Sequence, residues 1–138
     1  MPRALALDPR AQRLYVLNEF ADPRGNGSID VLKADDSGEK VGTFPLTTNP
    51  PYPTAQRPLA LALDPRARRL YVLYDHANGA DVHAPGAVWV VDTGAGRVRR
   101  KAPVGHAPDA LLVDTHTGHV FVANAGDNTV SMLDAAHL

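Results

Sequence analysis

The stretch PLALALDPRARRLYVLYD, at residues 58–75, occurs three times in this chain with small changes. It matches PRALALDPRAQRLYVLNE at residues 2–19 and PDALLVDTHTGHVFVANA at residues 108–125. Successive copies are offset by 56 and then by 50 residues, and each aligns without a gap. A repeat of this period indicates an architecture in which every copy is one supersecondary unit that packs against its neighbours.

Each copy has the pattern of short antiparallel strands. Apolar residues alternate with a period of two, as in LALALD at 59–64 and RLYVLY at 69–74, and a turn signal follows about every eight to ten residues. Every unit is therefore predicted to form four strands, and no segment has the pattern of a long helix. In the first unit the predicted strands fall at residues 4–8, 13–18, 28–34 and 40–46.

An aspartate opens the turn between the first two strands of each unit. These residues, Asp8, Asp64 and Asp114, are followed by Pro-Arg or Thr-His and are predicted to accept hydrogen bonds from the turn backbone rather than to act in chemistry. The turns ADDSGE at 34–39 and DTGAGR at 92–97 carry a glycine where a positive φ is expected.

Four antiparallel strands repeating at this period indicate an all-β protein built from β-propeller blades. The units resemble YVTN-type propeller repeats, in a superfamily that also includes lactonase-like propellers. The segments that carry the resemblance are RLYVLN at 13–18, RLYVLY at 69–74, HVFVAN at 119–124, DNTVSMLD at 127–134 and VGHAP at 104–108. Two departures are Tyr74, where the family pattern has Asn, and TTNPPYPTAQ at 47–56, which replaces a compact Val-Gly-x-x-Pro step.

The repeat predicts one partial propeller domain over residues 1–138, with blades at 2–57, 58–107 and 108–138 and the last blade lacking its outer strand. A closed propeller has typically four to eight blades, so three blades would leave two apolar faces uncovered. Either further blades of the same protein or self-association is expected to cover them. The pattern favours a piece of a larger propeller protein, and two copies closing a six-bladed ring are the alternative.

Length variation concentrates on one face of the predicted blades. The connections at residues 19–27, 47–57 and 75–86 join strands on the same side, whereas the turns on the other side are all tight. Because a repeat scaffold tolerates longer loops on its binding side, this face is the predicted ligand site. Its candidate binding residues are Arg24, Tyr52, Arg57, Asp75, His76, Asp81, His83 and His106.

Two groups of these candidate binding residues also have a purely structural interpretation. Asp75, His76, Asp81 and His83 form a weak candidate metal site, but their spacing fits no established motif and solvated polar loop residues are the favoured interpretation. Tyr52, among three prolines, is either presented to a partner or packed against the rim of the blades.

Composition limits the partners and the chemistry. The 138 residues carry a formal net charge of −1 and contain no cysteine, which excludes disulfides, thiolate metal sites and cysteine nucleophiles. No apolar run reaches the roughly 20 residues of a membrane span. The basic strand GRVRRKAPV at 96–104 is expected to protect a sheet edge, with nucleic acid or an acidic partner as the minority hypothesis.

The favoured function is a non-enzymatic scaffold that binds a protein, glycan or small ligand through these loops. No catalytic constellation is visible and the sequence requires no cofactor. The alternative is a part of a propeller enzyme, either a lactonase-like hydrolase or a metal- or quinone-dependent oxidoreductase, with its catalytic residues in other blades. The family resemblance implies an extracytoplasmic or surface location, although Met1 leads into a strand without a signal peptide.

Overall fold

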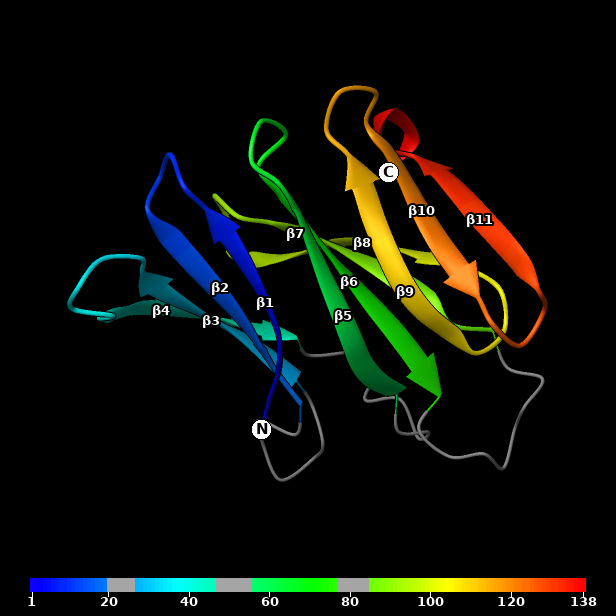
Figure 1. Cartoon of the computed structure of the whole chain (residues 1–138), viewed down its shortest axis with the longest axis horizontal. Coiled ribbons are helices and arrows are strands. Elements are labelled where there is room, and N and C mark those ends of the chain that lie inside the picture. The colour runs from blue at the N-terminus through cyan, green and yellow to red at the C-terminus, as the bar shows by residue number, and fades with distance from the viewer. Residues whose placement is uncertain (20–26, 47–55, 77–84) are drawn as a thin grey trace.

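The computed structural model describes residues 1–19, 27–46, 56–76 and 85–138, which form three antiparallel sheets (Figure 1). Blade 1 consists of β1 (Pro2–Asp8), β2 (Arg13–Asn18), β3 (Gly27–Lys33) and β4 (Lys40–Leu46). Blade 2 consists of β5 (Gln56–Asp64), β6 (Arg69–His76), β7 (Ala87–Asp92) and β8 (Arg97–Pro103). Blade 3 consists of β9 (Pro108–Asp114), β10 (His119–Asn124) and β11 (Thr129–Asp134), followed by the 3-10 helix η1 (Ala135–His137).

The predicted architecture is confirmed. The strands pair in chain order within each sheet, and the third sheet has three strands where the others have four. In blade 1 the observed strands agree with the predicted ones to within two residues, and β5 begins two residues before the expected start of the second repeat. Among the described residues the 3-10 turn is the one helical element.

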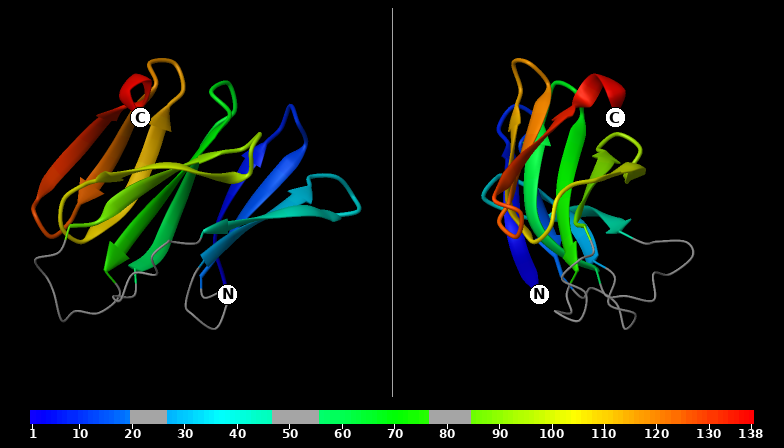
Figure 2. Two further views of the ribbon diagram at one scale, coloured as in Figure 1. Left: turned by 180° about the vertical axis from the view of Figure 1, so that it is seen from behind. Right: turned by 90° about the vertical axis from the view of Figure 1, so that its right-hand side faces the viewer.

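The three sheets stand side by side as a wedge, with the first strands β1, β5 and β9 adjacent to one another (Figures 1 and 2). Side chains alternate between the two faces of each sheet. We call the face that packs against the following blade the forward face, and the opposite one the rear face.

The apolar cores lie between the blades. Between blades 1 and 2, the forward residues Tyr15, Leu17, Ile29 and Val31 meet the rear residues Leu70, Val72, Trp89 and Val91. Between blades 2 and 3, the forward residues Tyr71, Leu73, Val88 and Val90 meet the rear residues Val120 and Val122. All of these side chains are buried, so blade 2 is covered on both faces while blades 1 and 3 are each covered on one.

Blade 2 replaces a polar cross-strand pair by an aromatic one. In blade 1, Asn18 Nδ2 donates a hydrogen bond to Asp30 Oδ2 at 2.9 Å, and Asn124 makes a similar bond to strand β11 in blade 3. In blade 2 the equivalent residues are Tyr74 and Trp89, whose rings stack with centroids 4.0 Å apart. Both members of the pair change together, and the stacked rings leave the Tyr74 hydroxyl and the Trp89 indole nitrogen buried without a hydrogen-bond partner.

The turn aspartates act as predicted. Asp8 Oδ1 accepts hydrogen bonds from the backbone amides of Arg10 and Ala11, both at 3.1 Å. Asp64 and Asp114 make the equivalent bonds in the other two blades. The Thr117 hydroxyl and the turn amides lower the pKa of Asp114.

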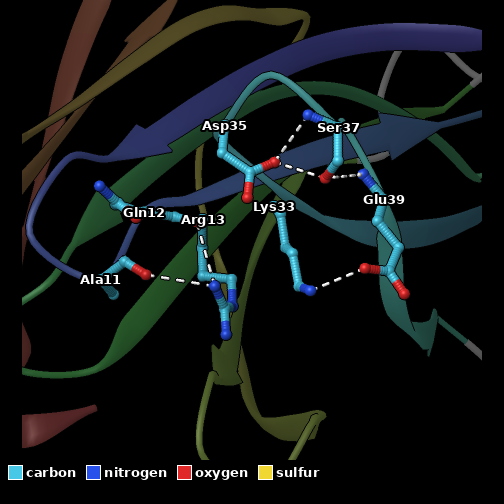
Figure 3. A network of polar contacts seen from close by, with 7 residues as sticks. All are labelled: Ala11, Gln12, Arg13, Lys33, Asp35, Ser37 and Glu39. Carbon is cyan, nitrogen blue, oxygen red and sulfur yellow. Dashed lines mark hydrogen bonds and ion pairs between the residues drawn. The ribbon is translucent and has the colours of Figure 1, made fainter.

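The turn between β3 and β4 is closed by side chains as well (Figure 3). Asp35 accepts hydrogen bonds from the amide and the hydroxyl of Ser37, and the Ser37 hydroxyl accepts one from the Glu39 amide. Lys33 Nζ lies 2.7 Å from Glu39 Oε2 across the same turn. Arg13 donates to two carbonyls of the neighbouring turn, so this end of blade 1 is held by local bonds.

The three equivalent turns share a left-handed residue that the sequence did not indicate. It is Gln12 with φ 52° in blade 1, Arg68 with φ 56° in blade 2 and Gly118 with φ 80° in blade 3. Only glycine adopts this region without a steric penalty, so blades 1 and 2 carry backbone strain that blade 3 avoids.

We therefore expect opposite effects from two substitutions. Gln12→Gly should raise the free energy of unfolding by up to about 1 kcal/mol, and Gly118→Ala should lower it by about 1 kcal/mol. An alanine Cβ at position 118 would meet Ala135 Cβ at 3.7 Å, an ordinary contact, so its effect would come from the backbone angle. Urea unfolding followed by the fluorescence of Trp89 measures both, and changes of the same sign would contradict the assignment.

Candidate functional site

The two ends of the wedge differ in how their strands are connected. At one end, the turn face, lie the short turns after β1, β3, β5, β7 and β9, together with η1, which follows β11 (Figure 1). At the other end, the loop face, lie the strand ends that flank residues 20–26, 47–55 and 77–84, together with the crossing at 104–107 and the turn at 125–128. The predicted binding residues that the structure describes, Arg57, Asp75, His76 and His106, belong to this loop face.

The structure places some of the predicted residues and not others. Arg24, Tyr52, Asp81 and His83 lie outside the described residues, and His76 is the last residue of β6. Arg57 and Asp75 are brought together as cross-strand partners in the β5–β6 pair. His106 lies in the crossing between β8 and β9, where it contacts Asp127.

A buried carboxylate joins blades 1 and 2 at the loop face. The Glu19 residue follows β2 and is 1% exposed. Its Oε2 atom lies 3.6 Å from Arg3 Nη1 and its Oε1 atom lies 3.8 Å from Arg57 Nε. Arg57 lies in β5 of blade 2, whereas the sequence analysis placed it at the end of blade 1. Since Arg3 and Glu19 belong to blade 1, the sequence could not show this cluster without the blade arrangement.

The geometry of this cluster leaves hydrogen-bonding capacity unused. Both ion pairs are longer than hydrogen bonds, and neither Glu19 Oε2 nor Arg57 Nε has a hydrogen-bond partner. A buried charge is costly unless it is paired, so the two guanidinium groups are held beside the carboxylate. Both arginine side chains remain partly exposed and can donate to a carboxylate, a phosphate or a hydroxyl of a ligand.

A second polar pair lies on the loop face of blade 3. The His106 ring Nδ1 is 2.8 Å from Asp127 Oδ1, and the His106 amide donates to Asp127 Oδ2 at 2.8 Å. The hydrogen bond from the His106 amide, and after it the contact with the His106 ring, lower the pKa of Asp127. Asp127 is a residue that the sequence did not single out, although it opens the motif DNTVSMLD.

Gly105 makes this contact possible. Its amide donates to Asn124 Oδ1 at 3.0 Å, which brings the crossing against the end of β10. A Cβ at this position would lie 2.5 Å from both Asn124 Cγ and Asp127 Oδ2, closer than real Cβ atoms approach. The glycine of VGHAP is therefore required by close approach rather than by an unusual φ.

Two of the four candidate metal ligands, Asp81 and His83, lie outside the described residues, so the candidate metal site stays a prediction. Within residues 1–19, 27–46, 56–76 and 85–138, no group of three or more His, Asp or Glu side chains is arranged to hold a metal ion. In the same part of the chain no helix is long and apolar enough to cross a membrane.

Several of the basic residues bind the chain itself. The strand β8 is the edge of its sheet, as predicted. Arg69 donates to the Ala135 carbonyl and Arg100 to the His137 carbonyl, both at 2.6 Å, which fastens η1 to blade 2. The Lys101 ammonium lies 3.9 Å from the centre of the Trp89 ring, and burial lowers its pKa. A nucleic-acid surface on this strand stays a hypothesis from the sequence.

The turn face carries a cavity of about 350 Å³ that the sequence did not indicate. It is lined by the three equivalent turns, through Asp8, Pro9, Arg10, Ala11, Pro65, Arg66 and Thr115. Most of these residues belong to the turns that begin at Asp8 and Asp64. Both aspartate side chains already accept hydrogen bonds from the backbone amides of their own turns, and the two arginines are exposed. The cavity is an open depression between turns.

No protein-family model matches the chain. No curated protein matches it either. Among solved structures, a chain of a nidogen/laminin complex is similar with 17% identity and a TM-score of 0.63, over 99% of this chain and 44% of that one. A chain of hydrazine synthase from Kuenenia stuttgartiensis is similar with 18% identity and a TM-score of 0.51, over 88% of this chain and 43% of that one.

These similarities establish the fold. Both neighbours are β-propeller proteins, so the three sheets are propeller blades. The chain spans less than half the length of either neighbour. Membership of the YVTN-type family stays a prediction from the sequence motifs.

The pair of His106 and Asp127 gives a pH-dependent signal. Because the folded-state pKa of Asp127 is lowered, the contact is fully stabilising above the unfolded-state pKa of about 3.9 and is lost as the pH falls through the folded-state value. We expect the His106 amide resonance to show a step below the ordinary aspartate pKa in an NMR titration from about pH 5 downward. Asp127→Asn should remove the step, and a midpoint at or above the ordinary value would contradict the contact.

Proposed function

We propose that the protein is a non-catalytic propeller scaffold that binds a protein, glycan or small polar ligand on its loop face. The observation that carries this proposal is the difference between the two ends of the wedge. Turn-face connections are short and closed by their own hydrogen bonds, whereas connections of unequal length leave from the loop face. Loops can vary there without disturbing the packed sheets, which is how repeat scaffolds acquire binding sites.

The described loop-face residues suggest the chemistry of the ligand. Arg3 and Arg57, on blades 1 and 2, offer charged donors beside a buried carboxylate. His106 and Asp127, at the loop face of blade 3, offer a ring nitrogen and a carboxylate. Such a surface fits a ligand that carries both hydrogen-bond donors and acceptors, such as a glycan or an extended peptide. It does not fit a purely apolar ligand.

The neighbours are compatible with this proposal without deciding it. One neighbour belongs to a nidogen/laminin complex and the other is a hydrazine synthase, so the fold accommodates both binding proteins and enzymes. Catalysis by residues in other blades is therefore the alternative function.

Glycan and peptide arrays probed with the purified chain test the proposal. Ligands that bind should lose affinity at least about tenfold with Arg57→Lys or His106→Gln, which remove a forked donor and a ring nitrogen. Arg57→Lys keeps the positive charge next to Glu19, so the fold is expected to survive, and thermal unfolding checks this.

Arg10→Lys and His116→Gln are the matched controls, because they make the same substitutions on the turn face. They should leave binding unchanged. Ligands that are lost with the turn-face variants and retained with the loop-face variants would place the site at the opposite end and refute the proposal.

A further inference from the structure

The forward face of blade 3 is an exposed apolar surface. Leu112, Val130 and Met132 are 57%, 67% and 60% exposed, although all three lie in regular strands. Between them runs a groove of about 220 Å³, lined by Ala110, Leu111, Leu112, Phe121, Ala123 and Val130. An exposed apolar surface of this kind on a β-sheet indicates an interaction site.

The rear face of blade 1 is exposed in the same way. Leu5 and Leu7 on β1 are 64% and 56% exposed. They alternate with Ala4 and Ala6, which pack into the core between blades 1 and 2. The wedge therefore ends in two apolar sheet faces, one forward and one rear.

The repeat shows what each of these faces is built to contact. Val130 corresponds to Ile29 in blade 1 and Val88 in blade 2, which are fully buried against the rear face of the following blade. Leu5 corresponds to Leu61, which packs against the forward face of the preceding blade. The forward face of blade 3 is thus equivalent to the forward faces of blades 1 and 2, each of which packs against a rear face. The rear face of blade 1 is equivalent to the rear face of blade 2, which packs against a forward face.

The loop end of the two faces carries no charged side chain at the positions of the buried ion pair between blades 1 and 2. The buried ion pair between blades 1 and 2 joins Glu19 to Arg57. The residue of blade 3 equivalent to Glu19 is Ala125, and the residue of blade 1 equivalent to Arg57 is Met1. Both members of the pair are replaced by residues with apolar side chains, and the terminal ammonium of Met1 donates a hydrogen bond to the Glu19 carbonyl, so joining the faces would bury no unpaired side-chain charge from these positions.

We infer that the forward face of blade 3 binds the rear face of blade 1 in a second copy of this chain. Two such contacts, related by a two-fold axis, would close a ring of six blades, which lies within the usual range for propellers. Over 99% of its length the wedge superposes on part of a neighbouring propeller chain with a TM-score of 0.63, so its blades are stacked as in a propeller. A second copy supplies a face of matched shape and composition at both ends at once.

The solution mass of the chain across a dilution series tests this inference. The wild-type chain should be a dimer that dissociates on dilution. Val130→Asp and Leu5→Asp each place a charge on one of the two faces and should shift the midpoint of dissociation at least about a hundredfold toward higher concentration. Ala95→Asp, in the exposed turn of the middle blade, is the control and should not change it.

Cross-linking tests which faces meet. The chain has no cysteine, so Leu112→Cys and Leu5→Cys each introduce a single thiol. A short bismaleimide should link the two variants when they are mixed and should link neither variant to itself.

Three results would overturn the inference. The first is a monomer at every concentration with native circular dichroism, which would assign the faces to a different occupant such as a further blade. The second is a mass that grows beyond the dimer, because the contact would then be open-ended. The third is self-linking of the Leu112→Cys variant, which would mean that two forward faces meet.

Discussion

Every part of this structure depends on the burial of one sheet face against another. A four-stranded sheet with alternating side chains has two apolar faces, and neither can be covered from within the blade. Ile29 and Val88 become fully buried only because the next blade supplies a rear face, and the equivalent Val130, at the end of the described wedge, is exposed. The repeat in the sequence is therefore a repeat of contacts, and the blade is stable only as part of a series.

The same packing separates the two ends of the molecule. Because each strand crosses the wedge from one end to the other, turns after β1, β5 and β9 collect at one end and the longer connections at the other. Asp8, Asp64 and Asp114 close the first set with backbone hydrogen bonds, which leaves little for a ligand there. At the loop face, by contrast, Glu19 and Asp127 bind residues that come from a different blade or a different connection.

Much of the fold could be predicted because the repeat aligns without gaps over its strands. The strand limits, the turn aspartates and the missing outer strand follow from the local pattern. The polar clusters could not be predicted, since the contact of Glu19 with Arg57 exists only once two blades are in place. In the sequence, Tyr74 was visible only as a departure from the family pattern. That its ring stacks on Trp89 depends on the register between β6 and β7, which the sequence did not show. Of the eight predicted ligand residues, Arg57, Asp75 and His106 have placed side chains, and their role in binding stays a prediction.

Native-state hydrogen exchange, at concentrations low enough to keep the chain monomeric, tests the central claim that coverage by neighbouring blades determines stability. The strands β6 and β7 are covered on both faces, so their amides should exchange most slowly. The strands β1 and β11, at the ends of the wedge, should exchange much faster. Equal protection in all three blades, or the slowest exchange in blade 1 or blade 3, would contradict the account.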